Sequence, residues 1–285
     1  MRQDIIDLYD AFTHGTMGRR EFMKRLARIA GGAVAATALI SVLQNDYARA
    51  ETVSEDDDRL ETFTATFDQE GPAVDAYAAR PKGESILPAV IVIHENRGLN
   101  PHIKDVARRI ALEGYYAFAV DMLSPLGGTP ADEDKAREMI YTLDQEETVA
   151  KFAAITRELA LVKTHQRKVG AVGFCWGGGM VNALAVASPH LVAGVSYYGR
   201  QVAAEDAAKI KASLMLHYAG EDARINAGIP DYEAALKAAE VDYQLFTYEG
   251  AQHAFNNDTN TARYNKEAAD LAWSRTVAFF KEKLA

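Results

Sequence analysis

The sequence predicts one α/β domain built on a mostly parallel sheet with helices on both faces. Short strand-like apolar runs alternate with helix-length segments, which is the pattern of strands joined by crossover helices. Residues 89–94 are continuously apolar, as expected for a strand covered on both faces. The chain has 285 residues, 48% of them hydrophobic and 25% charged, so its composition is that of an ordinary globular protein. No internal repeat, low-complexity tract or second body domain is visible.

The first fifty residues differ from the rest. Arg19-Arg20-Glu21-Phe22-Met23-Lys24 precedes a small-residue apolar run at 29–43 and then Ala48-Arg49-Ala50. This three-part order is typical of a twin-arginine export signal with an Ala-x-Ala cleavage site, and the apolar run is short for a membrane span. However, residues 4–12 have helical apolar spacing. Two interpretations remain open: a cleaved signal that sends the protein to the periplasm, or a retained helical extension of a cytoplasmic protein.

The body starts after an acidic linker at 51–61 and covers residues 62–285. Residues 62–67 and 74–81 alternate in polarity around a Gly-Pro turn, which predicts an antiparallel hairpin at one edge of the sheet. The remaining pattern alternates strands and helices along the chain. We expect strands at 89–94, 115–123, 168–172, 191–199, 213–220 and 243–250, and helices at 103–113, 132–141, 146–163, 180–187, 232–240 and 264–283.

The only cysteine of the chain lies in the sequence Gly173-Phe174-Cys175-Trp176-Gly177, between a predicted strand and a predicted helix. A nucleophile on such a sharp turn needs glycine two positions before and after it, because side chains there would collide with the neighbouring elements. The start of the following helix favours a thiolate. An inert buried cysteine or a phosphate-binding turn are the alternatives.

Functional groups of a parallel sheet gather beyond the carboxyl ends of its strands. Cys175, Asp222 and His253 each follow a predicted strand, in the chain order nucleophile, acid, histidine that is typical of one class of hydrolases. Glu221 is a rival for the acid. Glu95 follows the strand at 89–94. These residues are expected to meet in one cleft.

From about residue 60 onward, the chain resembles the dienelactone hydrolase (carboxymethylenebutenolidase) family, which has the α/β-hydrolase fold. Five segments carry the resemblance in order. They are His94-Glu95-Asn96-Arg97-Gly98, Gly173-Phe174-Cys175-Trp176-Gly177-Gly178-Gly179, Tyr197-Tyr198-Gly199, Gly220-Glu221-Asp222 and Gly250-Ala251-Gln252-His253-Ala254-Phe255.

The resemblance implies ester or lactone hydrolysis without a cofactor, with Cys175 as nucleophile, His253 as base and Asp222 as its partner. Glu95 would hydrogen-bond the cysteine and help to switch it to a thiolate, and the backbone amides of Trp176 and Asn96 would form the oxyanion hole.

The residues that bind the substrate depart in part from the pattern of this family. We expect Tyr197, Tyr198 and Tyr218 to line the pocket with Trp176. The two arginines that bind the substrate carboxylate in this family are absent at 121–125 and 255–257. Arg97, Arg200 or Arg224 are the candidates to replace them.

Charge and ligand spacing exclude other classes. The net charge of −9 argues against a nucleic-acid partner. No clustered His or Cys spacing predicts a metal site. The expected partners are a small ester or lactone, the export machinery, and a second copy of the chain bound through the N-terminal segment. A non-catalytic periplasmic binding protein and a thiol-based redox protein are the rival functions, although no second cysteine is available to resolve an oxidised thiol.

Overall fold

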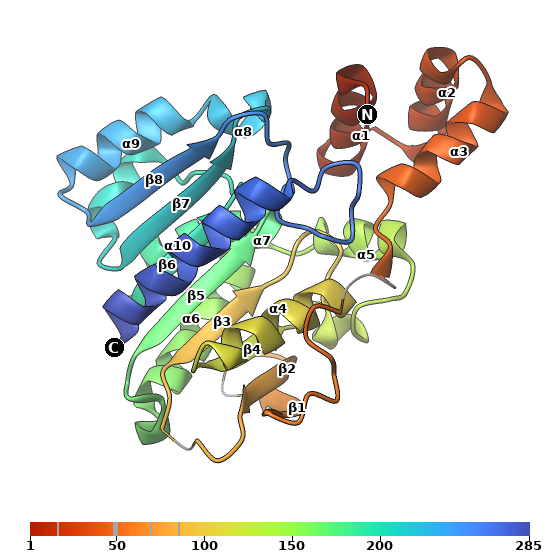
Figure 1. Ribbon diagram of the computed structural model, residues 1–285. Helices are drawn as coiled ribbons and strands as arrows, with labels where there is room; N and C mark the ends of the chain where they lie inside the picture. Colours follow the sequence, from red (N-terminus) through yellow and green to blue (C-terminus); the bar gives the residue numbers. More distant parts are fainter. Residues whose placement is uncertain (16, 48–50, 69, 85) are drawn as a thin grey trace.

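The computed structural model describes residues 1–15, 17–47, 51–68, 70–84 and 86–285. Its centre is an eight-stranded sheet in the order β1-β2-β4-β3-β5-β6-β7-β8. The β1/β2 and β2/β4 pairs are antiparallel, and all the others are parallel. The sequence prediction of a mostly parallel sheet with an antiparallel hairpin at one edge is therefore confirmed (Figure 1). The strands are β1 (Leu60–Phe67), β2 (Val74–Pro81), β3 (Ala89–Ile93), β4 (Tyr116–Val120), β5 (Val169–Phe174), β6 (Leu191–Tyr197), β7 (Ser213–Ala219) and β8 (Tyr243–Tyr248).

Helices cover both faces of this sheet. The body helices are α4 (Pro101–Leu112), α5 (Glu133–Ile140), α6 (Gln145–Leu161), α7 (Trp176–Ala187), α8 (Ala223–Asn226), α9 (Ile229–Ala238) and α10 (Lys266–Leu284), with short 3-10 turns η2 (Ser124–Leu126), η3 (Lys163–His165) and η4 (Ala204–Lys209). Residues of α4 and α10 pack into the core of one face, while those of α6, α7 and α9 pack into the core of the other.

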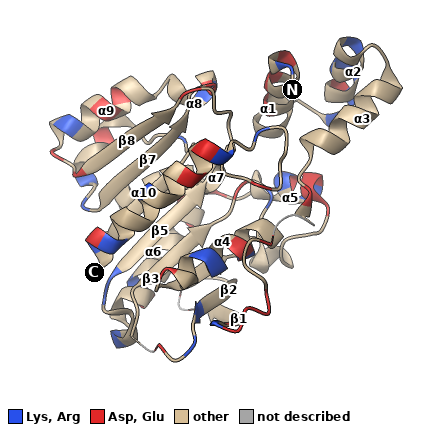
Figure 2. Cartoon of the chain, viewed as in Figure 1, with Lys and Arg blue, Asp and Glu red and all other residues tan. Residues whose placement is uncertain are grey.

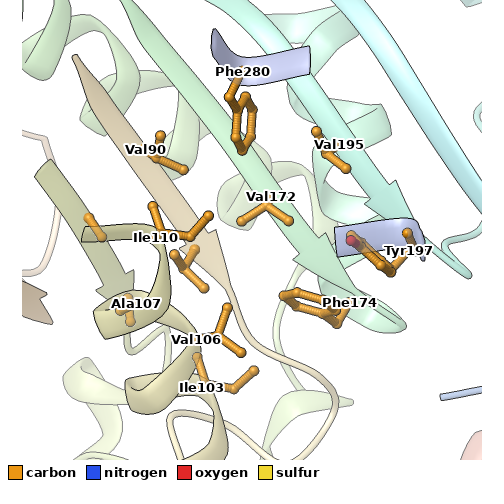
Figure 3. Close-up of a cluster of buried hydrophobic side chains, with 14 of the residues drawn as sticks. Val90, Ile103, Val106, Ala107, Ile110, Val172, Phe174, Val195, Tyr197 and Phe280 are labelled. Atoms are coloured by element: carbon orange, nitrogen blue, oxygen red, sulfur yellow. The ribbon is translucent and has the colours of Figure 1, made fainter. Parts of the chain in front are cut away.

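Successive side chains of the central strands point to opposite faces of the sheet, so each strand contributes to both hydrophobic cores. Val90 and Val92 of β3 face α4, whereas Ala89, Ile91 and Ile93 face the opposite layer. Figure 3 shows the first of these cores, where Ile103, Val106 and Ile110 of α4 lie near Val90 and Phe174. Strands β3 and β5 to β8 carry no Lys, Arg, Asp or Glu. The charged residues lie on the helices, on the loops and on the edge strands β1 and β2 (Figure 2).

The described residues 1–15 and 17–47 contain three helices, which lie at the end of the sheet to which the parallel strands point (Figure 1). These are α1 (Gln3–His14), α2 (Arg19–Ala30) and α3 (Ala33–Leu43). They share a small core of their own, in which Phe12 stacks on Phe22 with ring centroids 4.5 Å apart.

The basic pair and the apolar run of the predicted signal fall on α2 and α3. Arg19 and Arg20 are exposed. In the described part of the chain, no single helix is long and apolar enough to cross a membrane, and α2 with α3 passes that test only as a pair bent by 110°. The predicted cleavage site at 48–50 lies outside the described residues.

Most predicted elements are present, with shifted ends. Helix α7 begins at Trp176, directly after the cysteine, although the sequence pattern placed its start at residue 180. The run Trp176 to Gly179 contains three glycines, which hide helical periodicity. The linker before β1 is anchored, since the Val53 amide donates to Asp105 Oδ1 at 2.8 Å.

Candidate active site

Cys175 occupies the sharp turn between β5 and α7. Its φ of +55° and ψ of −112° are strained for a residue with a side chain. A Cβ at Gly173 would collide with the Gly177 carbonyl group, and a Cβ at Gly177 would collide with the Ile93 carbonyl oxygen. Glycine is therefore required at both positions by close backbone contact, as the sequence analysis argued. The turn places Cys175 Sγ at the carboxyl edge of the sheet.

His253 and Asp222 come together at the same edge. His253 Nδ1 lies 2.5 Å from Asp222 Oδ2, and both side chains are buried. Asp222 Oδ1 also accepts the Ile225 amide, which fixes the carboxylate at the start of α8. Its neighbour Glu221 is exposed, so the structure favours Asp222 over that rival. His253 Nε2 has no hydrogen-bond partner among the described residues and lies within 4.8 Å of Cys175 Sγ.

The charges of this group act on one another. Burial alone would lower the pKa of His253, but the Cys175 thiolate and the Asp222 carboxylate outweigh burial and raise the pKa of that imidazole. Burial likewise opposes ionisation of Asp222, yet its hydrogen bond and charge interaction with His253 lower the pKa of the carboxyl. The arrangement favours an imidazolium at His253, which lies between Asp222 and Cys175 and can donate a proton.

Glu95 lies beside the cysteine turn but hydrogen-bonds other groups. Its Oε2 accepts from Asn257 Nδ2 at 2.8 Å, and its Oε1 accepts from the Tyr198 hydroxyl at 3.5 Å. Within the described residues it makes no hydrogen bond to Cys175, which differs from the contact that the family resemblance implies. The thiol instead has His14 as its partner.

Helix α1 closes over the cleft. His14 Nε2 lies 3.2 Å from Cys175 Sγ, and the His14 ring meets the His253 ring edge-on at 4.6 Å. The Thr13 carbonyl oxygen accepts from Asn96 Nδ2 at 3.0 Å and from the Tyr141 hydroxyl at 3.0 Å. The last turn of α1 thus contacts Cys175 through His14, and its Thr13 carbonyl group occupies the donors of Asn96 and Tyr141.

Arginines of the body fasten α1 in place. Arg263 forms a 3.0 Å ion pair with Asp10 and lies over the Tyr9 ring, and Arg137 lies over the Phe12 ring at 4.1 Å. The cavity that remains at Cys175 has a volume of about 30 Å³. That is room for a water molecule, whereas sites for organic ligands have volumes of hundreds of Å³. An ester can reach the thiol only after α1 has moved.

Two guanidinium groups line this cavity, from Arg97 and Arg263. Arg97 was a sequence candidate, and it contacts Asp134 and the Tyr9 hydroxyl. Arg200 and Arg224, the other two candidates, are exposed and do not line the cavity. Arg263 was missed because it follows no strand and belongs to none of the matched segments.

Two of the expected pocket tyrosines lie elsewhere. Tyr197 is fully buried, and its hydroxyl is 2.7 Å from Thr276 Oγ1 on α10. Tyr218 is also fully buried, in the core on the opposite face of the sheet. The prediction that these two line the pocket is wrong, because their positions near strand ends point them into the two cores. Tyr198 does reach the site, with its ring 5.0 Å from the His253 ring. Trp176 stacks on His94 at 5.1 Å.

Three residues with positive φ surround the site: Cys175, Tyr198 and Ala254. Such strained backbone persists where the surrounding structure enforces it, and it clusters at functional sites. Sequence reasoning missed this feature, as it missed His14 and Tyr141. No sequence pattern around His14 predicts that it belongs to the site, because only the docking of α1 brings it to Cys175.

Comparison with known proteins agrees with this geometry. The model of the "Dienelactone hydrolase family" matches residues 74–284, which include the cysteine turn, Asp222 and His253. The chain belongs to this family. A second family model, "YqhI-like", matches residues 1–32, which hold α1 and α2.

Relatives of this dienelactone hydrolase family member align over most of their length. A protein of Saccharolobus solfataricus, provisionally named carboxymethylenebutenolidase, is 33% identical over 251 residues, covering 75% of this chain and 96% of its own. The crystal structure of a provisionally named dienelactone hydrolase from Klebsiella pneumoniae has a TM-score of 0.70 at 29% identity, covering 78% and 99% of the two chains. A dienelactone hydrolase-like promiscuous phosphotriesterase from metagenomic libraries, with a TM-score of 0.69 at 23% identity and coverage of 79% and 99%, shares the fold.

Proposed function

We propose that this hydrolase cleaves carboxylic esters or lactones through a Cys175-His253-Asp222 triad and an acyl-thioester intermediate. The observation that carries the proposal is the strained cysteine turn, which places Sγ beside an imidazole already bound to a buried carboxylate. Family membership supports hydrolysis in general, and this arrangement supports cysteine as the attacking group.

In the first step, the Cys175 thiolate attacks the carbonyl carbon of the substrate. A carbon–sulfur bond forms, and the carbonyl π electrons move to oxygen. The backbone amides of Trp176 and Asn96 are proposed to stabilise that oxyanion. When the intermediate collapses, the carbon–oxygen bond to the leaving group breaks, and the protonated His253 donates its Nε2 proton to the departing oxygen.

In the second step, water attacks the thioester. His253 Nε2 takes a proton from the water, and the carbon–sulfur bond breaks to release the carboxylic acid. The proton taken from water stays on His253, so the thiolate–imidazolium pair is restored and the cycle needs no other reactant. Asp222 holds His253 with Nε2 directed at the reacting atoms throughout. Glu95, which Tyr198 and Asn257 hold beside the cysteine turn, is proposed to help switch the thiol to a thiolate when substrate arrives.

Residues 1–50 are proposed to act as a twin-arginine signal that directs the protein to the periplasm. The exposure of Arg19 and Arg20 while α1 is docked supports recognition of a folded chain by the export machinery. Removal of the segment would also clear the cleft of α1, so the exported form would be the active one. A retained segment in a cytoplasmic protein, or one that pairs two copies of the chain, is the alternative.

The proposed function is tested by turnover of small aryl esters and lactones with the wild type and Cys175→Ala, using protein with and without residues 1–50. We expect Cys175→Ala to lose turnover while its circular dichroism spectrum and melting temperature are retained. Unchanged turnover in the variant would refute the assignment. Absence of turnover in every form of the wild type would favour a binding protein.

A further inference from the structure

The docking of α1 brings three potential metal ligands together beside the cleft. His14 Nε2, Cys175 Sγ and His253 Nε2 all lie within 4.8 Å of one another. One comes from α1, one from the turn before α7 and one from the loop after β8. Sequence spacing could not predict this group, because its members are 161 and 78 positions apart and none lies in a metal-binding motif.

We propose that His14, Cys175 and His253 bind a Zn²⁺ ion that fastens α1 over the active site. One thiolate and two imidazoles are a ligand set that zinc uses in proteins, with a fourth position left for water. In a tetrahedral zinc site, ligand atoms lie about 3.3–3.6 Å apart. The observed 3.2 Å between His14 Nε2 and Cys175 Sγ is just below this range. The other separations are at most 4.8 Å and need to close by no more than about 1.5 Å.

The surroundings of both imidazoles suit a metal. A zinc-bound histidine usually donates its other ring N–H to a carboxylate or a backbone carbonyl, which fixes the ring and directs a lone pair at the metal. His253 Nδ1 has Asp222 as this partner, and His14 Nδ1 has the Asp10 carbonyl at 3.2 Å. In that tautomer both Nε2 atoms are free to coordinate.

One atom of the group lacks a partner. His253 Nε2 is buried, and its residue is 1% exposed, yet it makes no hydrogen bond to any described residue. A buried polar atom without a partner is costly, and a metal ion in the neighbouring cavity would satisfy it. Binding would release one proton from the Cys175–His253 pair to solvent, so that a thiolate and two neutral imidazoles hold the ion.

A zinc ion at this site would inhibit the enzyme, and this part of the inference rests on the proposed hydrolase function. The ion would hold the nucleophile, occupy the lone pair of the base and tie both to α1. The full-length chain would therefore be kept inactive by zinc, and a chelator or removal of α1 would release it. Zinc binding itself does not depend on the hydrolytic activity.

The test uses the full chain, with Met1 confirmed by intact mass. After dialysis against a chelator, zinc binding is titrated against a chromophoric competitor for the wild type, His14→Ala and the control His190→Ala, which changes an exposed histidine outside the group. We expect one zinc per chain in the wild type and in the control, and an affinity at least about 10-fold weaker in His14→Ala. Equal affinity in the wild type and His14→Ala, or no binding in the wild type, would overturn the proposal.

A second readout shows whether the ion contacts these residues. With Co²⁺ in place of zinc, the wild type should show a sulfur-to-cobalt charge-transfer band that Cys175→Ser lacks. Zinc should also slow hydrogen exchange of the α1 amides in the wild type and not in His14→Ala. A band that persists in Cys175→Ser would contradict the assignment of the sulfur ligand. If the chain binds zinc but hydrolyses no ester, the proposed function fails and the metal site stands.

Discussion

At the residue scale, mutation can distinguish Asp222, the acid of the proposed triad, from its neighbour Glu221. Asp222→Asn removes the charge that stabilises an imidazolium at His253, and should lower kcat on aryl esters on the order of 10²–10⁴-fold. Glu221→Gln is the matched control, because Glu221 is adjacent in sequence but exposed. Kinetics in which Glu221→Gln loses activity and Asp222→Asn keeps it would reverse the assignment.

The preference for a charged or a neutral substrate is a second property that we expect single residues to determine. Once α1 has left, Arg263 loses its partner Asp10, and its guanidinium group faces the cleft. We expect a preference for esters that carry a carboxylate over neutral esters of the same size. Arg263→Gln should raise KM for the anionic ester by about 10–150-fold, for a charge-assisted hydrogen bond of about 1.5–3 kcal/mol, and leave KM for the neutral one nearly unchanged. An equal effect on both esters would exclude this role.

Individual residues also show where sequence reasoning is sufficient. Cys175, Asp222 and His253 could be placed in one cleft because each follows a strand of a parallel sheet, and strand order fixes where those ends lie. Tyr197 and Tyr218 could not be placed correctly, since the direction of a side chain at a strand end depends on register. His14 could not be predicted at all, because only tertiary contact brings it to the cysteine.

At the scale of elements, α1 controls access to the cleft. Phe12 anchors the helix between the Phe22 ring and the Arg137 guanidinium group. Phe12→Ala should weaken docking by up to about 3–5 kcal/mol, the cost of removing a buried phenyl group. The initial rate of ester hydrolysis by the full-length chain should therefore rise.

Val34→Ala is the control for this change, since Val34 lies in the same segment and is 88% exposed. It should leave the rate unaltered. A lower rate in Phe12→Ala, with the fold retained, would show that α1 supports activity instead of blocking it.

Helix α4 is tied to the loop after His253 by a charged cluster. Asp258 contacts His102 at 3.0 Å and Arg109 at 2.5 Å. Burial opposes ionisation of Asp258, but hydrogen bonds and charge interactions with His102 and Arg109 outweigh it and hold the pKa of the carboxyl well below its usual value. A carboxyl whose pKa is lower in the folded state stabilises the fold above its unfolded pKa of about 3.9, and this stabilisation is lost as pH falls below that value.

Asp258→Asn should therefore lower the free energy of unfolding on the order of 1–3 kcal/mol at pH 7. The difference from the wild type should shrink at pH 3. Urea unfolding at the two pH values measures it, with Asp270→Asn as a control, because Asp270 is 61% exposed and its ion pair among the described residues is with Lys266. A difference that is as large at pH 3 as at pH 7 would show that the charge of Asp258 is not its source.

At the scale of the whole molecule, the sheet and the site were largely predictable and the arrangement of the first fifty residues was not. Continuous apolar runs such as β3 identify buried parallel strands, and alternating runs such as β1 and β2 identify the edge hairpin. The segment at 1–50 has export features and a helical pattern together, and neither reveals where it packs. In the structure its first helix lies over the edge of the sheet that carries Cys175 and His253. The same segment is therefore proposed both to direct export and to control access to the cleft.

The central claim is that acyl transfer proceeds through the sulfur of Cys175. Acid quenching during turnover of a slow aryl ester, followed by intact-mass and peptide mass spectrometry, measures it most directly. Our account predicts one added acyl mass on the peptide that contains Cys175, removable by hydroxylamine and absent from Cys175→Ala. Full turnover with an acyl group on another residue, or turnover by Cys175→Ala at the wild-type rate, would contradict it.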